Sequence, residues 1–214
     1  MKPGPRRSLS QADVVAAAFG VLEEKGFAAV SVRAVAAALH LTPAALYTYF
    51  PSKGALQRAM VEHLLSTLDL AAASDTRLSW RERVHALAAT LRSRFAEHPG
   101  AIVLVTSGPL DGAHALALNE VLITGFADEG MPPPDAARAA GAVRAYVLGT
   151  ALLDAASAAG LGAPAGEPGE PLWSDAAGFP LTEATADAVR ADDGSAGGLD
   201  RLLDGFERLV PVIE

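Results

Sequence analysis

Apolar residues recur at intervals of three and four through most of the chain, which is the spacing of one face of an α-helix. Residues 11–25 show the pattern well, since Val14, Val15, Ala18 and Leu22 would share a face. Alanine leads the hydrophobic residues, which make up 50% of the chain, whereas aromatic residues, which favour strands, make up only 6%. The pattern and the composition together predict an all-α protein.

Capping residues divide the first part of the chain into short predicted helices. A serine or threonine hydroxyl accepts a hydrogen bond from the free N–H groups of a helix's first turn, and such residues precede four apolar runs: Ser10, Ser31, Thr42 and Ser52. Gly26 and Pro51 are the expected stops, and Pro43 suits a first helical position. The predicted helices cover residues 11–25, 32–39, 44–50 and 53–72.

Two short helices joined by a turn of three or four residues and braced by a longer first helix form a helix-turn-helix. The later helix of such a unit enters the major groove of DNA. Its stretch here reads "TPAALYTYFPSK", in which Leu46 and Phe50 share the predicted buried face, so that Tyr47 and Tyr49 lie away from it. A tyrosine can contact phosphate oxygens and thymine methyl groups, although both tyrosines also fit as ordinary core or surface aromatics.

Charge is distributed unevenly along the chain. Residues 1–60 hold seven basic and three acidic groups, a net charge of +4, so the remainder carries −12 to give the total of −8. A basic N-terminal part (residues 1–60, the head) followed by an acidic remainder (the body) is expected where the head binds a polyanion. Such asymmetry also arises by chance. The chain has no cysteine and no apolar run typical of a signal peptide or membrane span, which predicts a cytoplasmic protein without a membrane segment.

The head resembles the TetR/AcrR family of transcriptional regulators through "FGVLEEKGFAAVSVRAVAAALHLTPAALYTYFPSKGALQRAM". The resemblance implies that Arg33 reads a base from the second helix, that base-facing positions begin the recognition helix, and that three further residues contact phosphates. The base-facing residues are Thr42, Pro43, Ala44 and Tyr47, and the phosphate-contacting residues are Ser31, Tyr49 and Lys53. Arg6 and Arg7 fit either an arm on the DNA or a disordered tail.

The remainder of the chain reads as further helices with one long interruption. Helices are predicted over residues 80–97, 101–107, 111–129, 135–159, 182–190 and 199–210, with Ser79 capping the first of them. Residues 160–180 are rich in glycine and proline and read as an exposed loop, in which Trp173 and Phe179 are unusual. We therefore expect a helix-turn-helix DNA-binding domain at residues 1–55 and a helical ligand-binding and dimerisation domain at 56–214.

This body resembles the C-terminal domain of the tetracycline-repressor branch through "WRERVHALAATLRSRFAEHPG", "AYVLGTALLDAA" and "GLDRLLDGFERLV". A helical bundle can enclose a small apolar or amphipathic ligand. Candidate pocket residues, each of which fits plain core packing as well, are His63, Thr67, Trp80, Val84, Leu87, Leu91, Val103, Ser107, His114, Leu118 and Tyr146. The stretch "AIVLVTSG" lacks the histidine that helps to bind a metal–drug chelate in that branch, and Asp69 replaces a drug-contacting histidine, so we expect neither a metal nor a cofactor.

Helices 135–159 and 199–210 are small or apolar on more than one face, which predicts burial beyond a single chain unless both pack within the monomer. The resemblance implies a four-helix homodimer interface, and a two-fold dimer suits a palindromic operator on double-stranded DNA. The reading is a dimeric repressor released from its operator by a small molecule. The alternatives are a DNA-binding regulator controlled by a protein partner and, from another class, a hydrolase using His98 or His114, although catalytic motifs are missing from the sequence.

Overall fold

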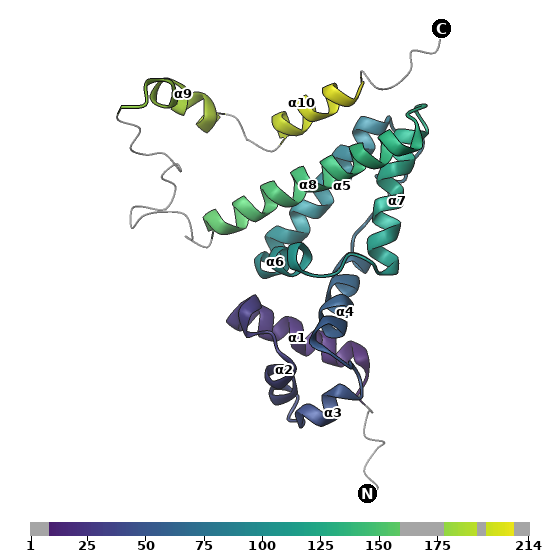
Figure 1. The fold of residues 1–214 in the computed structure, drawn as a ribbon, viewed down its shortest axis with the longest axis vertical. Coiled ribbons are helices and arrows are strands. Elements are labelled where there is room, and N and C mark those ends of the chain that lie inside the picture. Colours follow the sequence, from purple (N-terminus) through teal and green to yellow (C-terminus); the bar gives the residue numbers. More distant parts are fainter. Residues whose placement is uncertain (1–8, 159–177, 192–195, 208–214) are drawn as a thin grey trace, which may run out of the picture. The chain divides into compact units, whose positions relative to one another are not determined.

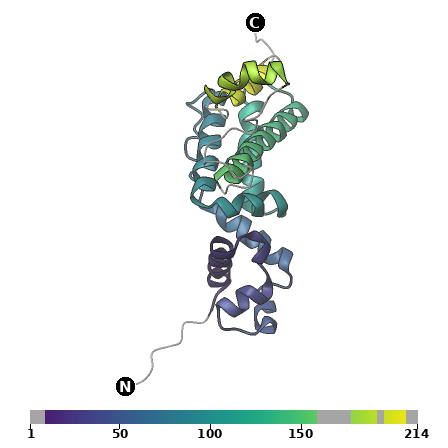
Figure 2. The same cartoon turned by 90° about the vertical axis from the view of Figure 1, so that its left-hand side faces the viewer.

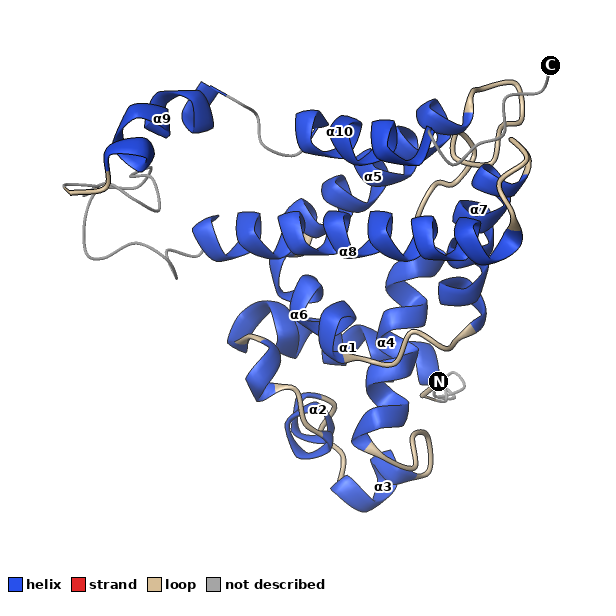
Figure 3. Ribbon diagram, turned by 45° about the horizontal axis from the view of Figure 1, so that its top comes forward, coloured by secondary structure: helices blue, strands red, loops and turns tan. Residues whose placement is uncertain are grey.

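The chain forms helices throughout the described residues. The computed structural model describes residues 9–158, 178–191 and 196–207. Every regular element in these three ranges is a helix, as Figure 3 shows, which confirms the all-α prediction. The helices group into two compact units, one formed by Met1–Asp69 with Glu97–Leu118 and the other by Leu70–Ala96 with Asn119–Glu214. Arg6, Arg7 and Trp173 lie outside the described residues.

The first unit joins the predicted DNA-binding head to a later part of the chain (Figure 1). Its elements are α1 (Gln11–Lys25), the 3-10 helix η1 (Phe27–Ala29), α2 (Val32–Ala38), α3 (Pro43–Tyr47), α4 (Lys53–Ser66), α6 (Pro99–Ser107) and the start of α7 (Ala113–Ala127). Fully buried side chains of α1, α3, α4 and α6 form the core of this unit: Val14, Leu22, Leu46, Leu56, Met60, Ile102 and Leu104. The predicted DNA-binding helices are therefore held by apolar residues that have helical spacing in the sequence.

Capping chemistry begins and ends α1 where the sequence predicts it. The Asp13 N–H donates to Ser10 Oγ at 3.2 Å, and the Ser10 N–H donates to Asp13 Oδ2 at 2.8 Å, which together form a capping box. At the other end Gly26 has a φ of 77° and its N–H donates to the Leu22 carbonyl at 2.9 Å. A side chain at this φ would be strained, so glycine ends the helix without cost.

Helix α4 ends six residues earlier than predicted, at Ser66 rather than at residue 72. The Ser66 and Thr67 hydroxyls donate to the carbonyls of His63 and Leu64, both at 2.7 Å. The next backbone bonds, from Thr67 to Leu64 and from Leu68 to Leu65, span three residues instead of four. Because such hydroxyls compete with the backbone ladder, the last turn tightens and the chain leaves the helix.

Two side chains of α4 hold the segment that starts α7. Arg58 donates from Nε and Nη2 to the two carboxylate oxygens of Asp111 at 2.7 and 2.8 Å, and this pairing lowers the pKa of Asp111. One turn later, Glu62 accepts from the His114 N–H at 2.8 Å and from the Ala115 N–H at 3.2 Å. A Cβ at Gly112 would collide with the Glu62 side chain, so a larger residue there would displace the Glu62 carboxylate from these N–H groups.

Acid is expected to weaken this contact, because Glu62 must be ionised to accept both N–H groups well. Burial raises its pKa, but hydrogen bonds from His114 and Ala115 outweigh burial and lower it. The Glu62 contribution is therefore fully present above the ordinary glutamate pKa of about 4.3 and is lost as the pH falls through the lower folded value. We expect Glu62→Gln to cost about 1–2 kcal/mol at neutral pH, and the cost to shrink towards pH 3.

Thermal unfolding of wild type and Glu62→Gln between pH 7 and pH 3 measures this effect. Glu120→Gln, at an exposed position of α7, is the matched control and should follow the wild type at every pH. A constant difference between wild type and Glu62→Gln down to pH 3 would show that the Glu62 charge does not hold the start of α7.

The second unit contains the remaining helices, seen from the side in Figure 2. These are α5 (Trp80–Glu97), the end of α7, α8 (Pro133–Ala158), α9 (Pro180–Ala191) and α10 (Ala196–Glu207). Ser79 and Glu82 form a capping box that begins α5, so both predicted ends of this helix are confirmed. The other helix bounds lie within three residues of the predictions where they are described; position 159 and positions 208–210 fall outside the described residues. Phe126, which is 1% exposed, packs against the rings of Trp80 and Phe206.

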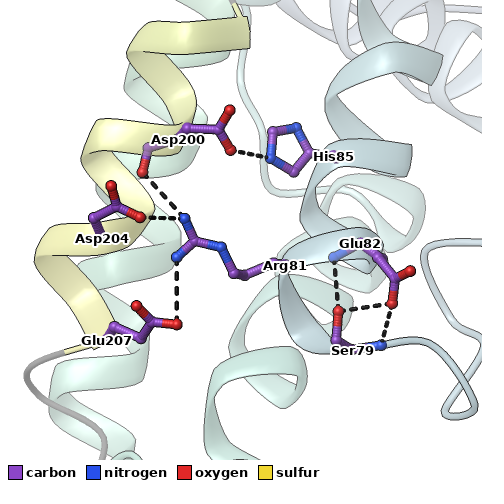
Figure 4. A network of polar contacts seen from close by, with 7 residues as sticks. All are labelled: Ser79, Arg81, Glu82, His85, Asp200, Asp204 and Glu207. Atoms are coloured by element: carbon purple, nitrogen blue, oxygen red, sulfur yellow. Dashed lines mark hydrogen bonds and ion pairs between the residues drawn. The ribbon is translucent and has the colours of Figure 1, made fainter.

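A polar network fastens α10 to α5, as Figure 4 shows. Arg81 forms an ion pair with Asp204, lies 3.7 Å from a carboxylate oxygen of Glu207, and donates to the Asp200 carbonyl at 3.4 Å. One turn further along α5, His85 Nε2 lies 2.8 Å from the Asp200 carboxylate. These contacts hold α10 against α5, although the two helices lie more than a hundred residues apart in sequence.

Helix α8 is long and apolar enough to cross a membrane by length and composition alone, in the part of the chain that the structure describes. The core helix of a globular protein passes the same test. Here one face of α8 packs into the second unit through buried Ala136, Ala140, Val143 and Val147. Leu152 and Leu153, in contrast, are 39% and 63% exposed.

Candidate nucleic-acid interface

The helix-turn-helix consists of α2, a four-residue turn and α3, which pack against each other (Figure 1). The turn begins where the His40 N–H donates to the Ala37 carbonyl at 3.0 Å and the Leu41 N–H to the Ala36 carbonyl at 2.8 Å. His40 has a φ of 55°, the left-handed conformation in which a helix commonly ends. Its side chain is exposed, as the sequence suggested.

Hydroxyl caps begin the helices that would face DNA. Ser31 Oγ accepts from the Ala34 N–H at 3.1 Å, Thr42 Oγ1 from the Ala45 N–H at 3.2 Å, and Ser52 Oγ from the Ala55 N–H at 3.1 Å. Each hydroxyl acts as the acceptor in its cap, which leaves its own O–H group as a donor. A phosphate oxygen accepts such a donor, so a capping role and a phosphate contact are compatible at Ser31.

Helix α3 separates a buried face from an exposed one, as its sequence predicts. Leu46 is 0% exposed and Phe50 is 5% exposed, whereas Tyr47 is 51% exposed and Tyr49 is half-buried. Pro43 and Ala44 at the start of the helix are exposed as well. The first turn therefore presents small apolar groups and one aromatic ring to solvent.

The recognition helix is shorter than predicted, because it ends at Tyr47 rather than at Phe50. The Thr48 hydroxyl donates to the Ala45 carbonyl at 2.6 Å, and the Tyr49 N–H donates to the Leu46 carbonyl, three residues back, at 3.0 Å. Pro51 also disfavours a helical conformation at the residue before it. Tyr49 thus lies in the turn after α3, outside the helix itself.

Two exposed cations belong to the same unit as α3. Arg33 lies on the exposed face of α2, and Lys53 is the first residue of α4. The Lys53 ammonium lies 6.0 Å from the centroid of the Phe27 ring. Arg33 and Lys53 are the charged members of the predicted DNA contacts.

Gln11 contacts a predicted DNA-contacting residue, Tyr49, and the sequence did not predict this contact. Its side-chain amide donates from Nε2 to the Tyr49 carbonyl at 2.9 Å, across 38 residues of sequence. A single polar residue at the start of a helix gives no pattern from which such a contact could be predicted.

The candidate pocket residues divide between the two units. His63, Thr67, Ser107 and His114 are exposed in the first unit, where Val103 and Leu118 are half-buried. In the second unit Tyr146 is half-buried, and the core contains four of the candidates: Trp80, Val84, Leu87 and Leu91. Burial of those four suits both a pocket wall and plain packing, so the pocket stays a prediction.

Histidine–carboxylate pairs occur in the first unit. His98 Nδ1 lies 2.9 Å from Glu23, and His114 Nδ1 lies 3.1 Å from Glu62. A carboxylate is thus within reach of each histidine proposed for hydrolysis, so the geometry alone does not remove an enzymatic reading. Glu62 already caps α7, however, and among the described residues no group of three histidine or carboxylate side chains could hold a metal ion.

Comparison with known protein families accounts for most of the chain. Residues 14–60 match the bacterial regulatory proteins of the tetR family. Residues 73–210 match the tetracycline repressor-like C-terminal domain. The first match contains the helix-turn-helix, and the second covers more than half of the chain.

Two curated relatives illustrate the match. The tetracycline repressor protein class G of Vibrio anguillarum is 29% identical over 209 residues, which are 96% of this chain and 97% of that protein. An HTH-type transcriptional regulator of Saccharopolyspora erythraea is 30% identical over 142 residues, 66% of this chain. The chain spans only 59% of the length of that regulator.

Solved structures share the fold. A possible TetR family regulator from Streptomyces coelicolor A3(2) has a TM-score of 0.79 at 28% identity, over 93% of this chain and 99% of that one. A single-residue variant of TetR from Acinetobacter baumannii AYE, in complex with minocycline, has a TM-score of 0.71 at 25% identity, over 96% and 100%. BioQ with its natural double-stranded DNA operator has a TM-score of 0.63 at 32% identity, over 70% and 89%.

The family match argues against the enzymatic alternative at His98 and His114, because members of this family regulate transcription by binding DNA and are not enzymes. The helix-turn-helix of the first unit is the DNA-binding part that this family uses. The chain belongs to the tetR family of bacterial regulatory proteins and has a tetracycline repressor-like C-terminal domain.

Proposed function

We propose that this regulator is a dimeric repressor that binds a palindromic operator and is released by a small molecule. The observation that carries the DNA contact is the pairing in α3 of a fully buried Leu46 with an exposed Tyr47. A side chain this large and this exposed, in the first turn of a recognition helix, can reach a base edge, which supports the proposed contact. The operator bound by BioQ supports the same role for this fold.

Each predicted contact residue then has a role that fits its chemistry. Arg33 donates to guanine, and Thr42, Pro43, Ala44 and Tyr47 face bases, with thymine methyl groups as partners for the apolar ones. Ser31, Tyr49 and Lys53 hold phosphates, to which they offer hydroxyl or ammonium donors. We propose that this DNA-binding part ends near residue 55. The regulator is proposed to act in the cytoplasm, where its operator is.

The dimer is proposed to form through α8 and α10 of each subunit. The two helices pack together in the second unit, and α8 keeps Leu152 and Leu153 exposed beside its buried face. The Arg81 network holds α10 in place for this contact. Two identical heads related by a two-fold axis would read two half-sites of inverted sequence.

The ligand is proposed to be small and apolar or amphipathic, held by the tetracycline repressor-like domain. Minocycline bound to the A. baumannii relative supports a small-molecule ligand for this fold. Ligand and operator would oppose each other, with a coupling of about 1–3 kcal/mol, or roughly 5- to 150-fold in affinity. A second candidate is control by a protein partner, which the 68% and 81% exposure of Phe179 and Leu181 favours.

Selection of bound duplexes from a random DNA pool tests the proposal. We expect enrichment of a two-fold-symmetric motif whose half-sites are about one helical turn apart, or a multiple of it. A compound library screened against that duplex should then contain molecules that release the protein. Enrichment of no motif would contradict operator binding. Release of the regulator from the duplex by a purified partner protein, but by no small molecule, would favour the second candidate.

A further inference from the structure

The contact between Gln11 and Tyr49 joins two parts of the DNA-binding head that the sequence leaves unrelated. Gln11 is the first residue of α1, and Tyr49 lies in the turn that follows the recognition helix. The Gln11 amide donates to the Tyr49 carbonyl oxygen at 2.9 Å. This distance is typical of a well-formed N–H···O hydrogen bond.

The acceptor lies in backbone whose N–H groups are bonded back to α3. The N–H groups of Tyr49 and Phe50 both donate to the Leu46 carbonyl, at 3.0 and 3.1 Å, and the buried Phe50 ring anchors the chain below. The Tyr49 carbonyl belongs to the peptide plane between these residues. The Phe50 N–H of the same plane donates to the Leu46 carbonyl, so the bond from Gln11 is a second restraint, and the two bonds together hold the backbone from which the Tyr49 side chain extends.

The donor end is rigid enough to act as a reference. The capping box between Ser10 and Asp13 orders the first turn of α1 on either side of Gln11. Val14 and Val15, 0% and 5% exposed, fix the next turn in the core. The backbone of Gln11 is held on both sides, so its side-chain amide links the start of α1 to the turn after α3 at a defined position.

We propose that Gln11 is a positioning residue for DNA recognition, which acts by holding the Tyr49 carbonyl so that the Tyr49 phenol meets its phosphate. This inference rests on the proposed operator binding and on the phosphate contact of Tyr49. Phosphate contacts set the register of a protein on the duplex. A rotation at Tyr49 therefore changes affinity for the operator without changing which bases are read.

The test uses the duplex recovered by selection and full-length protein. Gln11→Met keeps the length of the side chain and removes the donor, and we expect operator affinity to fall about two- to tenfold, the size that one such hydrogen bond supports. Gln11→Asn keeps the amide, but its shorter side chain cannot reach the Tyr49 carbonyl, so operator affinity should fall by the same factor. Ala12→Met, which adds the same side chain at the neighbouring exposed position, should bind like wild type, and all three variants should stay folded, with melting temperatures within about 4 °C of wild type.

A double-mutant cycle with Tyr49→Phe separates positioning from direct contact. If Gln11 acts through the Tyr49 phenol, Gln11→Met has no further effect once that hydroxyl is gone. Additive losses would mean that Gln11 touches the DNA itself and would overturn the inference, as would unchanged affinity of Gln11→Met on a duplex that the wild type binds. Failure of the wild type to select any motif is a different result, because it removes the proposed function and this inference together.

Discussion

Shortening Leu46 to alanine is expected to destabilise the first unit by about 2–5 kcal/mol, because the side chain is completely buried and its removal leaves a cavity. Leu46 is the apolar anchor of a five-residue helix, which has too few backbone hydrogen bonds to stay folded alone. Urea unfolding followed by circular dichroism measures the loss. Operator binding should disappear with it, since the recognition helix loses its support.

Tyr47→Ala is the matched comparison, one residue along the same helix. Tyr47 is half exposed, so its removal should change the free energy of unfolding by no more than about 0.5 kcal/mol while operator binding is lost. Equal destabilisation by the two variants would mean that Tyr47 is a structural residue, and the proposed division of α3 into a core face and a DNA face would be wrong.

Arg33→Ala is expected to weaken operator binding by about 1–3 kcal/mol, or roughly 5- to 150-fold, because a guanidinium can donate two parallel hydrogen bonds to guanine. Arg33 is exposed on α2, and its removal should leave folding unchanged. Discrimination at one base pair of each half-site should relax in the same variant. Fluorescence anisotropy with the selected duplex and with single-base variants of it measures both effects.

Two further variants show whether the Arg33 effect comes from base reading. Arg33→Lys keeps the charge but not the fork, so it should not restore discrimination. Arg77→Ala removes the same charge from the second unit, at an exposed side chain paired with Asp75, and should leave binding unchanged. A loss for Arg33→Ala that is equal on every sequence would indicate a phosphate contact instead of a base contact.

The sequence by itself determined the helices and, where a capping residue precedes them, their starts. Ser10, Ser31, Thr42, Ser52 and Ser79 begin helices in the structure as predicted, because a cap acts on N–H groups two or three positions away. The buried face of α3 followed from the same short-range geometry, since residues four apart share a side of a helix. The resemblance of the head to its family was also visible, because its motif is continuous in the chain.

Only the tertiary structure decided which distant residues meet. The bond from Gln11 to Tyr49, the contacts of Arg58 and Glu62 with residues 111–115, and the ion pair of Arg81 with Asp204 join positions between 38 and 123 residues apart. The ends of two helices were also not predictable from the sequence. Helix α4 stops at Ser66 and α3 at Tyr47, because serine and threonine hydroxyls bond to backbone carbonyls there and compete with a further helical turn. Local pattern fixes what each segment becomes, whereas packing of the whole chain selects the partners, because side-chain contacts depend on position in space and not on distance along the sequence.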